Sequence, residues 1–213
     1  MKRLLILALL FLAGCTHQFN PPTPVDPLAQ VTASTLRISV QTLMGEGACT
    51  AFAVGPRTYL TADHCTPGAA DWDYTAGGQK AFVLKADPKT DLALLLVGLD
   101  HPRLTLREEP LTKGEQVRAL GYAYGFTLPV VLPLAVQLLE YTLEESIYPG
   151  TVYTPGVIGG MSGGPIFDGQ GQVVGIVQRG GALLGYGVSN KTIRDFLYYH
   201  TGVNHTSTHK FVS

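Results

Sequence analysis

The stretch that decides the fold reads GGMSGGP at residues 159–165, a serine surrounded by glycines and followed by a proline. A serine hydroxyl is a weak nucleophile until a neighbouring base takes its proton. Glycines on both sides free the backbone to approach a substrate carbonyl and to point N–H groups at it. The stretch therefore predicts Ser162 as a nucleophile, with the amides of Gly160 and Ser162 as an oxyanion hole. The competing interpretation is a glycine-rich turn with an incidental serine.

The residues after the serine distinguish between two folds. Residues 160–164 satisfy G-x-S-x-G, the motif of α/β-hydrolase esterases. In that fold a helix follows the serine directly, and an acid and then a histidine come downstream. Here Pro165 follows, and strands are predicted over 165–167 and 173–178 around a turn at 168–171. The pattern disfavours an α/β-hydrolase.

A histidine and a cysteine lie together upstream, in TADHC at residues 61–65. His64 comes just after a predicted strand over 58–62, at a loop mouth where a general base can reach a substrate. Cys65 follows it directly, and a bridge to Cys49 would pin the strand that carries the histidine. Closing a loop of that size contributes about 3 kcal/mol on chain-entropy grounds.

The acid expected beside the histidine is Asp91, which precedes a wholly apolar strand predicted over 92–97. An aspartate in this position can be partly buried, which suits a residue that orients a histidine and stabilises its cation. Asp87 is the competitor. It precedes Pro88 and is typical of a turn residue.

Short strands are expected along most of the chain. Hydrophobic residues make up 46% of the 213 residues and charged residues 15%, which is apolar enough for a large core. Short apolar or alternating runs between glycines and prolines predict an all-β sandwich or barrel. The expected strands cover residues 35–40, 49–54, 58–62, 81–85, 92–97, 116–121, 134–142, 165–167, 173–178 and 183–188.

One helix is expected near the end, over about residues 191–200. Asn190 is a favourable N-cap. Ile193, Phe196 and Leu197 recur at helical spacing and predict a stripe that faces the core.

Charge and histidine content exclude two classes of partner. The formal net charge is −1, so neither sign dominates and no electrostatic case for nucleic acid exists. His205 and His209 lie in a polar tail without a third ligand, so no metal site is expected.

The N-terminus carries a targeting signal. Lys2 and Arg3 precede an apolar run over 4–13 that is too short to span a bilayer comfortably. The run ends in LAGC at 12–15, which resembles the bacterial lipobox, where signal peptidase cuts before a cysteine that is diacylated. An ordinary signal peptide with a chance cysteine is the alternative.

The lipobox resemblance implies a signal peptide over 1–14 and a lipid anchor at Cys15 that holds the exported protein on the cell envelope. Thr16 follows the cysteine, and by resemblance to enterobacterial lipoproteins this favours the outer membrane, on its periplasmic side. Residues 15–34 form a polar, proline-rich stretch that predicts an extended tether. In an oxidising compartment the two remaining cysteines can form a disulfide.

The histidine, aspartate and serine occur in the chymotrypsin-like order along the chain. Over about residues 35–200 the sequence resembles bacterial trypsin-like serine proteases. The matching stretches are Cys49 with TADHC at 61–65, Asp91-Leu92-Ala93-Leu94, Gly160-x-Ser162-Gly163-Gly164-Pro165 and Gly175-Ile176-Val177.

The resemblance implies two six-stranded antiparallel β-barrels of the chymotrypsin type with a C-terminal helix over residues 35–202, followed by a polar tail over 203–213. It implies a serine endopeptidase that cleaves protein or peptide substrates through an acyl-enzyme on Ser162. His64 would be the base and Asp91 its orienting acid. No cofactor and no metal are implied.

The family's disulfide beside its histidine corresponds to Cys49–Cys65, but three positions depart from the family pattern. Asp63 stands where alanine is usual, and Gln178 stands where many relatives have a serine. Met161 occupies the position where animal trypsins carry an aspartate that pairs with a newly cut N-terminus. Activation by that ion pair is therefore not expected.

The resemblance also predicts the substrate pocket. Gly156 would lie at its floor, and Val177, Gly180 and Gly187 would line its walls. No carboxylate for Lys or Arg is evident, so a small or medium apolar side chain is expected before the scissile bond. Arg179 at the rim could instead favour acidic residues.

A protease-derived binding module with a distorted site is the non-enzymatic alternative. Such modules often lose a member of the triad. None is lost here.

Overall fold

A computed structural model describes residues 26–42, 45–66, 68, 74–142 and 149–202. The predicted signal peptide, lipidated cysteine and polar tail lie outside these residues. Within the described ranges, no helix has both the length and the apolar character needed to cross a membrane.

The first half of the described chain forms a closed antiparallel barrel in the order β1-β2-β3-β6-β5-β4. Its strands are β1 (Thr35–Thr42), β2 (Gly45–Gly55), β3 (Thr58–Thr61), β4 (Tyr74–Ala76), β5 (Gln79–Asp87) and β6 (Leu92–Val97). Alternate residues point into the barrel, where Ile38, Tyr59 and Leu95 are fully buried. Leu92 and Leu94 on the other face of β6 are buried against a second core, which explains why this strand is apolar throughout.

The second half forms another closed antiparallel barrel, in the order β10-β11-β12-β9-β8-β7. Its strands are β7 (Gln116–Gly121), β8 (Val130–Tyr141), β9 (Gly150–Thr154), β10 (Pro165–Phe167), β11 (Val173–Gly180) and β12 (Gly185–Ser189). Tyr153, Ile166 and Val177 are fully buried in its centre. The expected fold of two six-stranded barrels is confirmed.

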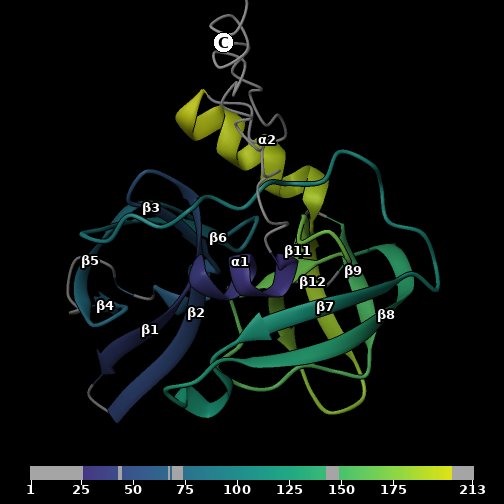
Figure 1. Ribbon diagram of the computed structural model, residues 1–213, viewed down its shortest axis with the longest axis horizontal. Helices are drawn as coiled ribbons and strands as arrows, with labels where there is room; N and C mark the ends of the chain where they lie inside the picture. Colours follow the sequence, from purple (N-terminus) through teal and green to yellow (C-terminus); the bar gives the residue numbers. More distant parts are fainter. Residues whose placement is uncertain (1–25, 43–44, 67, 69–73, 143–148, 203–213) are drawn as a thin grey trace, which may run out of the picture.

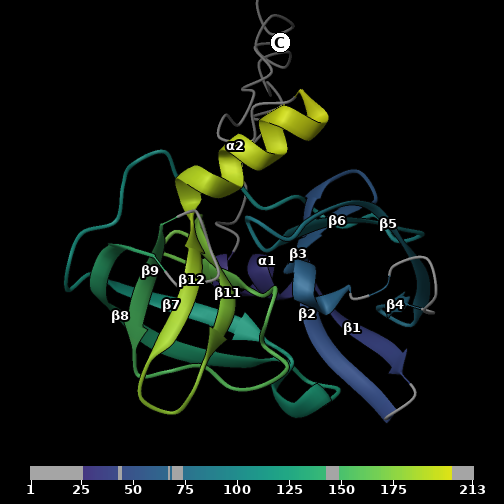
Figure 2. The same cartoon turned by 180° about the vertical axis from the view of Figure 1, so that it is seen from behind.

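A separate hydrophobic core joins the two barrels, which lie side by side in Figures 1 and 2. Phe52 and Leu94 from the first barrel and Phe167 and Ile176 from the second belong to this one buried cluster. The interior of the interface between the barrels is therefore apolar. Loops at the edge of this interface lie between strands of both barrels.

Two helices cover this inter-barrel core. Helix α1 (Pro27–Ala33) starts with Asp26, whose side chain accepts a hydrogen bond from the Leu28 N–H at 3.0 Å, and it buries Val31 completely. These residues fall in the stretch predicted as an extended tether, so the structure differs there, because burial of Val31 stabilises a short helix.

The C-terminal helix is confirmed as α2 (Asn190–Thr201). It buries Ile193, Phe196 and Leu197 against the same core, as their spacing predicts. Its N-cap is Ser189, which accepts a hydrogen bond from the Thr192 N–H at 3.3 Å, so the helix starts one residue before the prediction.

Candidate active site

The first barrel brings His64 and Asp91 together through strand pairing. His64 lies in the short 3₁₀ turn η1 (Asp63–Cys65), just after β3, and Asp91 immediately precedes β6. Strands β3 and β6 pair with Thr61 opposite Ala93. Because the two strands are antiparallel neighbours, the residues after one and before the other meet at the same end of the barrel.

Asp91 holds the histidine ring from one side. The His64 Nδ1 atom lies 2.9 Å from both Asp91 oxygens, and the His64 backbone N–H donates to Asp91 Oδ1 at 3.0 Å. The Asp91 side chain is 12% exposed and the His64 side chain 46% exposed. The carboxylate therefore fixes the imidazole proton on Nδ1, which leaves Nε2 as an acceptor that faces solvent.

Asp87, the competing acid, has a structural role in the turn before β6. Its carboxylate accepts hydrogen bonds from the Lys89 N–H at 3.1 Å and the Thr90 hydroxyl at 3.0 Å. These contacts cap the turn that delivers Asp91, which has a left-handed backbone with φ of 53°.

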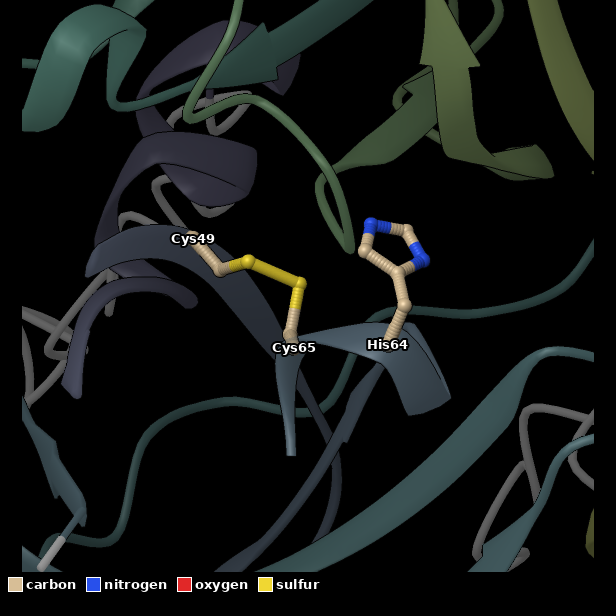
Figure 3. Close-up of side chains that lie close together, drawn as sticks. All are labelled: Cys49, His64 and Cys65. Carbon is tan, nitrogen blue, oxygen red and sulfur yellow. A yellow bond between two sulfur atoms is a disulfide. The ribbon is translucent and has the colours of Figure 1, made fainter. Parts of the chain in front are cut away.

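The Cys49–Cys65 disulfide forms beside the histidine, as Figure 3 shows, with its Cα atoms 6.0 Å apart. It ties β2 to the turn that carries His64. The two sulfurs and a His64 ring nitrogen also lie within 4.8 Å of one another. Thiolates are the metal-binding form of cysteine, and these sulfurs are already bonded to each other, so the group does not make a metal site.

Asp63 adds a further carboxylate next to the histidine. Partial burial raises the pKa of the Asp63 carboxyl, and the nearby charges of Asp91 and Asp87 raise it further, while His64 acts in the opposite direction. The alanine usual at this position has no such effect.

The second barrel supplies Ser162 from the loop that enters β10. Its hydroxyl donates a hydrogen bond to the backbone oxygen of Gln178 in β11 at 2.9 Å. Because a hydroxyl has one proton to donate, the serine must rotate before it can donate to the histidine. Catalytic hydrogen bonds are often long or misaligned before substrate binds.

The glycines around the serine are required by space. Gly160 has φ of +91°, and a Cβ there would lie 2.4 Å from the Tyr122 carbonyl oxygen. Gly163 has φ of +81°, and its Cβ would lie 2.2 Å from the Thr50 carbonyl oxygen. Both backbones therefore exclude any larger residue.

Two amides of this loop keep their donors available. Among the residues that the structure describes, neither the Gly160 N–H nor the Ser162 N–H donates a hydrogen bond within the protein. Met161, between them, donates to the Ile158 carbonyl at 3.1 Å and is fully buried in the second barrel. A buried apolar side chain thus anchors the loop where animal trypsins carry an aspartate.

The predicted pocket residues separate into two groups. Val177 is fully buried in the second barrel, and a Cβ on Gly187 would meet Ile166 and Ile176, so both face the barrel core. Gly156 lies against the 181–184 turn, because a Cβ there would fall 2.9 Å from the Leu184 oxygen.

Val157 is a neighbour of the predicted pocket glycines that sequence reasoning missed. Its two methyl groups would lie 2.9 Å from a Cβ on Gly180 and 3.0 Å from a Cβ on Gly185, and it is only 6% exposed. The space between these glycines is therefore filled by valine. The one sequence signal for Val157 is its position directly after Gly156, which is predicted to lie at the pocket floor.

Two closed six-stranded antiparallel barrels define the chymotrypsin type of fold. The sequence matches the trypsin-like peptidase domain family over residues 49–176. The chain belongs to this family.

Individual relatives agree with this membership. A probable periplasmic serine endoprotease, DegP-like, of Halomonas elongata is 38% identical over 100 residues, which are 46% of this chain and 21% of the relative. The serine protease Rv3671c of Mycobacterium tuberculosis is 36% identical over 138 residues, 60% of this chain and 35% of the relative. The chain thus spans about a fifth to a third of the length of these relatives.

Solved structures share the fold. The active form of the Rv3671c protease from M. tuberculosis superimposes with a TM-score of 0.70 at 25% identity, covering 85% of each chain. The inactive form gives 0.68 at 25% identity, over 82% of this chain and 92% of that one. The HtrA-type protease AlgW gives 0.71 at 20% identity, over 83% and 64% of the chains.

Proposed function

We propose that this protein is a serine endopeptidase with His64, Asp91 and Ser162 as its catalytic triad. The observation that carries the proposal is the pairing of His64 Nδ1 with both oxygens of a buried aspartate, 2.9 Å away. That pairing makes a poised general base at the end of one barrel, and the Ser162 carbonyl oxygen of the other barrel lies 3.7 Å from the Sγ atom of Cys65, the residue after His64. Family membership supports the same reaction class.

The proposed reaction starts when Ser162 Oγ leaves the Gln178 carbonyl, gives its proton to His64 Nε2 and attacks a peptide carbonyl carbon. The negative charge that develops on the carbonyl oxygen is stabilised by the Gly160 and Ser162 N–H groups. One such donor is typically worth about 3 kcal/mol of transition-state stabilisation.

The tetrahedral intermediate then collapses, and the C–N bond breaks as His64 gives its proton to the leaving amine. This leaves an acyl-enzyme on Ser162. Water then attacks the ester, His64 takes one of its protons, and the proton returns to Ser162 as the carboxylic acid product departs. Asp91 orients the ring and stabilises the imidazolium in both halves.

The proposed preference is for a small apolar side chain before the scissile bond. This preference is argued from Val157, an apolar side chain that fills the space between Gly180 and Gly185 and leaves little room beside them. Cleavage of a peptide library should therefore favour alanine- and valine-sized residues. A profile dominated by Lys or Arg would contradict this preference, and one dominated by acidic residues would instead support the rim arginine, Arg179.

The N-terminal assignments belong to the same proposal. Residues 1–14 would be a lipoprotein signal peptide, Cys15 the acylated residue on the outer membrane, 15–34 a linker that includes α1, and 35–202 the protease domain before the 203–213 tail. The periplasmic description of the Halomonas relative is consistent with export. Metabolic labelling with a fatty acid should mark the wild type and not Cys15→Ser.

Fluorophosphonate labelling with mapping of the modified residue tests the catalytic proposal. We expect labelling at Ser162 that is absent in Ser162→Ala and collapses in His64→Ala. Asp87→Asn is the matched control, because it removes a nearby charge outside the triad, while the asparagine Oδ1 can still accept from the Lys89 N–H in the turn before Asp91, so the variant should still be labelled. A folded, disulfide-bonded protein that resists labelling would favour the binding-module alternative.

A further inference from the structure

A buried hydroxyl joins the first barrel to the loop that carries Ser162. Thr50 lies in β2, next to Cys49, and is fully buried. Its hydroxyl donates a hydrogen bond to the Gly160 carbonyl at 2.9 Å and accepts one from the Tyr122 N–H at 3.0 Å. One side chain thus holds two loops of the second barrel.

These contacts fix both peptide planes beside the Gly160 amide. The Tyr124 N–H donates to the Gly159 carbonyl at 2.6 Å. In a trans peptide the N–H points opposite to the preceding C=O, so this bond turns the Gly160 N–H away from Tyr124. The Thr50 hydroxyl holds the Gly160 carbonyl, which belongs to the following peptide plane.

The hydrogen bonds form a closed circuit around Gly160. Tyr122 and Tyr124 belong to one turn, the 3₁₀ segment η2 (Ala123–Gly125) with its preceding residue. Tyr122 of this turn donates to the Thr50 hydroxyl, and the Thr50 hydroxyl donates to the Gly160 carbonyl. Tyr124 of the same turn donates to the Gly159 carbonyl, which closes the circuit. Glycine with φ of +91° is free to rotate without such restraint.

We propose that Thr50 is the positioning residue of the oxyanion hole. Its hydroxyl holds the Gly160 carbonyl and the Tyr122–Tyr124 turn, and thereby aims the Gly160 N–H at the substrate carbonyl oxygen. Thr50 does not touch the substrate, so it acts only through Gly160. The inference rests on the proposed endopeptidase function.

The side chain of Thr50 can be altered without loss of its backbone contacts. Its N–H donates to the Ser162 carbonyl at 2.8 Å, and its carbonyl accepts from the Thr61 hydroxyl at 2.7 Å. Valine has nearly the same shape as threonine and keeps both. Thr50→Val therefore removes only the hydroxyl, and it leaves the Gly160 carbonyl and the Tyr122 N–H without their partner.

The test compares steady-state cleavage of a chromogenic peptide ester and the rate of fluorophosphonate labelling. In Thr50→Val we expect kcat and the labelling rate to fall on the order of 10- to 100-fold, with KM changed less than about 3-fold, because a misaimed donor acts in the transition state. The pH profile should keep its acid limb, because His64 and Asp91 are untouched. Thr50→Ser should restore most of the rate.

Thr35→Val is the matched control. The buried Thr35 hydroxyl donates to the Val31 carbonyl at 2.7 Å, and the contact of Thr35 with the Tyr122 hydroxyl uses its backbone carbonyl, which valine keeps. We expect it to lose comparable thermal stability with unchanged kcat.

The outcomes separate the inference from the function on which it rests. If the wild-type protein is not labelled, the proposed endopeptidase function itself is contradicted. Wild-type labelling with an unaffected Thr50→Val would overturn the role of the hydroxyl alone. The role of the hydroxyl would also be overturned if Thr50→Ser were as slow as Thr50→Val, or if Thr35→Val lowered kcat equally.

Discussion

The two halves of the site are built by different means. In the first barrel, side chains fix His64: three hydrogen bonds reach the Asp91 carboxylate, and a disulfide holds the adjoining residue. In the second barrel, backbone conformation fixes the loop of Ser162 through left-handed glycines, and the serine hydroxyl donates to the Gln178 carbonyl.

In the proposed mechanism, the base is therefore assembled before substrate binds, whereas the serine completes its geometry afterwards. Changes in the first half should therefore act on proton transfer. Changes in the second half should act on the stabilisation of the oxyanion. The four variants that follow test this division.

Asp91→Asn should have the largest effect and would break the comparison most directly. An amide in place of the carboxylate favours the wrong imidazole tautomer, so we expect kcat to fall about 10,000-fold at neutral pH with little change in fold. Kinetics against pH, with circular dichroism as the folding check, measure this. A loss below about 10-fold would mean that Asp91 is not the orienting acid.

Gly160→Ala tests the second half of the site, the loop that carries Ser162. Its Cβ would lie 2.4 Å from the Tyr122 carbonyl oxygen at a backbone φ of +91°, so the loop must shift and the amide must move. We expect kcat to fall about 100- to 1,000-fold, as when one oxyanion donor is removed. Gly159→Ala is the control, because its Cβ would meet nothing within 4 Å. Equal losses in both variants would contradict the steric argument.

Removal of the disulfide should affect stability more than chemistry. The double variant Cys49→Ser with Cys65→Ser should lose about 3 kcal/mol of unfolding free energy, from a loop of 16 residues. Because Asp91 still holds His64, kcat should fall less than about 10-fold well below the melting temperature. Denaturant titration and kinetics on the same sample separate the two. A larger loss of kcat would show that the bridge itself sets the histidine position.

Asp63→Asn should have the smallest effect, a rise in melting temperature whose size depends on pH. Burial and neighbouring carboxylates raise the pKa of Asp63, so the folded protein holds this proton more tightly than the unfolded chain does. Asp63 therefore lowers stability progressively as pH rises from about 4 through the raised pKa. We expect the asparagine variant to melt about 1 °C higher at pH 7 and no higher near pH 3. Equal shifts at both pH values would exclude an electrostatic cause.

Local patterns predicted much of the fold and the candidate site. Alternating and apolar runs located most strands, but neither β4, which has three residues and is too short to give a periodic signal, nor β9 (Gly150–Thr154) was predicted. The helical stripe located α2, but the sequence predicts a tether where α1 forms, since the single buried residue of α1 gives no period. The family resemblance, not the periodicity, implied closure into two barrels.

The sequence by itself determined which residues are the candidates for catalysis and in what order they occur, because glycine spacing, an acid before an apolar strand and a histidine after one are local signals. Only the tertiary structure decided what surrounds them. Val157 fills the space between Gly180 and Gly185, Ser162 donates to Gln178, and Thr50 reaches Gly160 across 110 positions of sequence. Such contacts depend on how two barrels pack, and packing joins residues that no short stretch of sequence brings together.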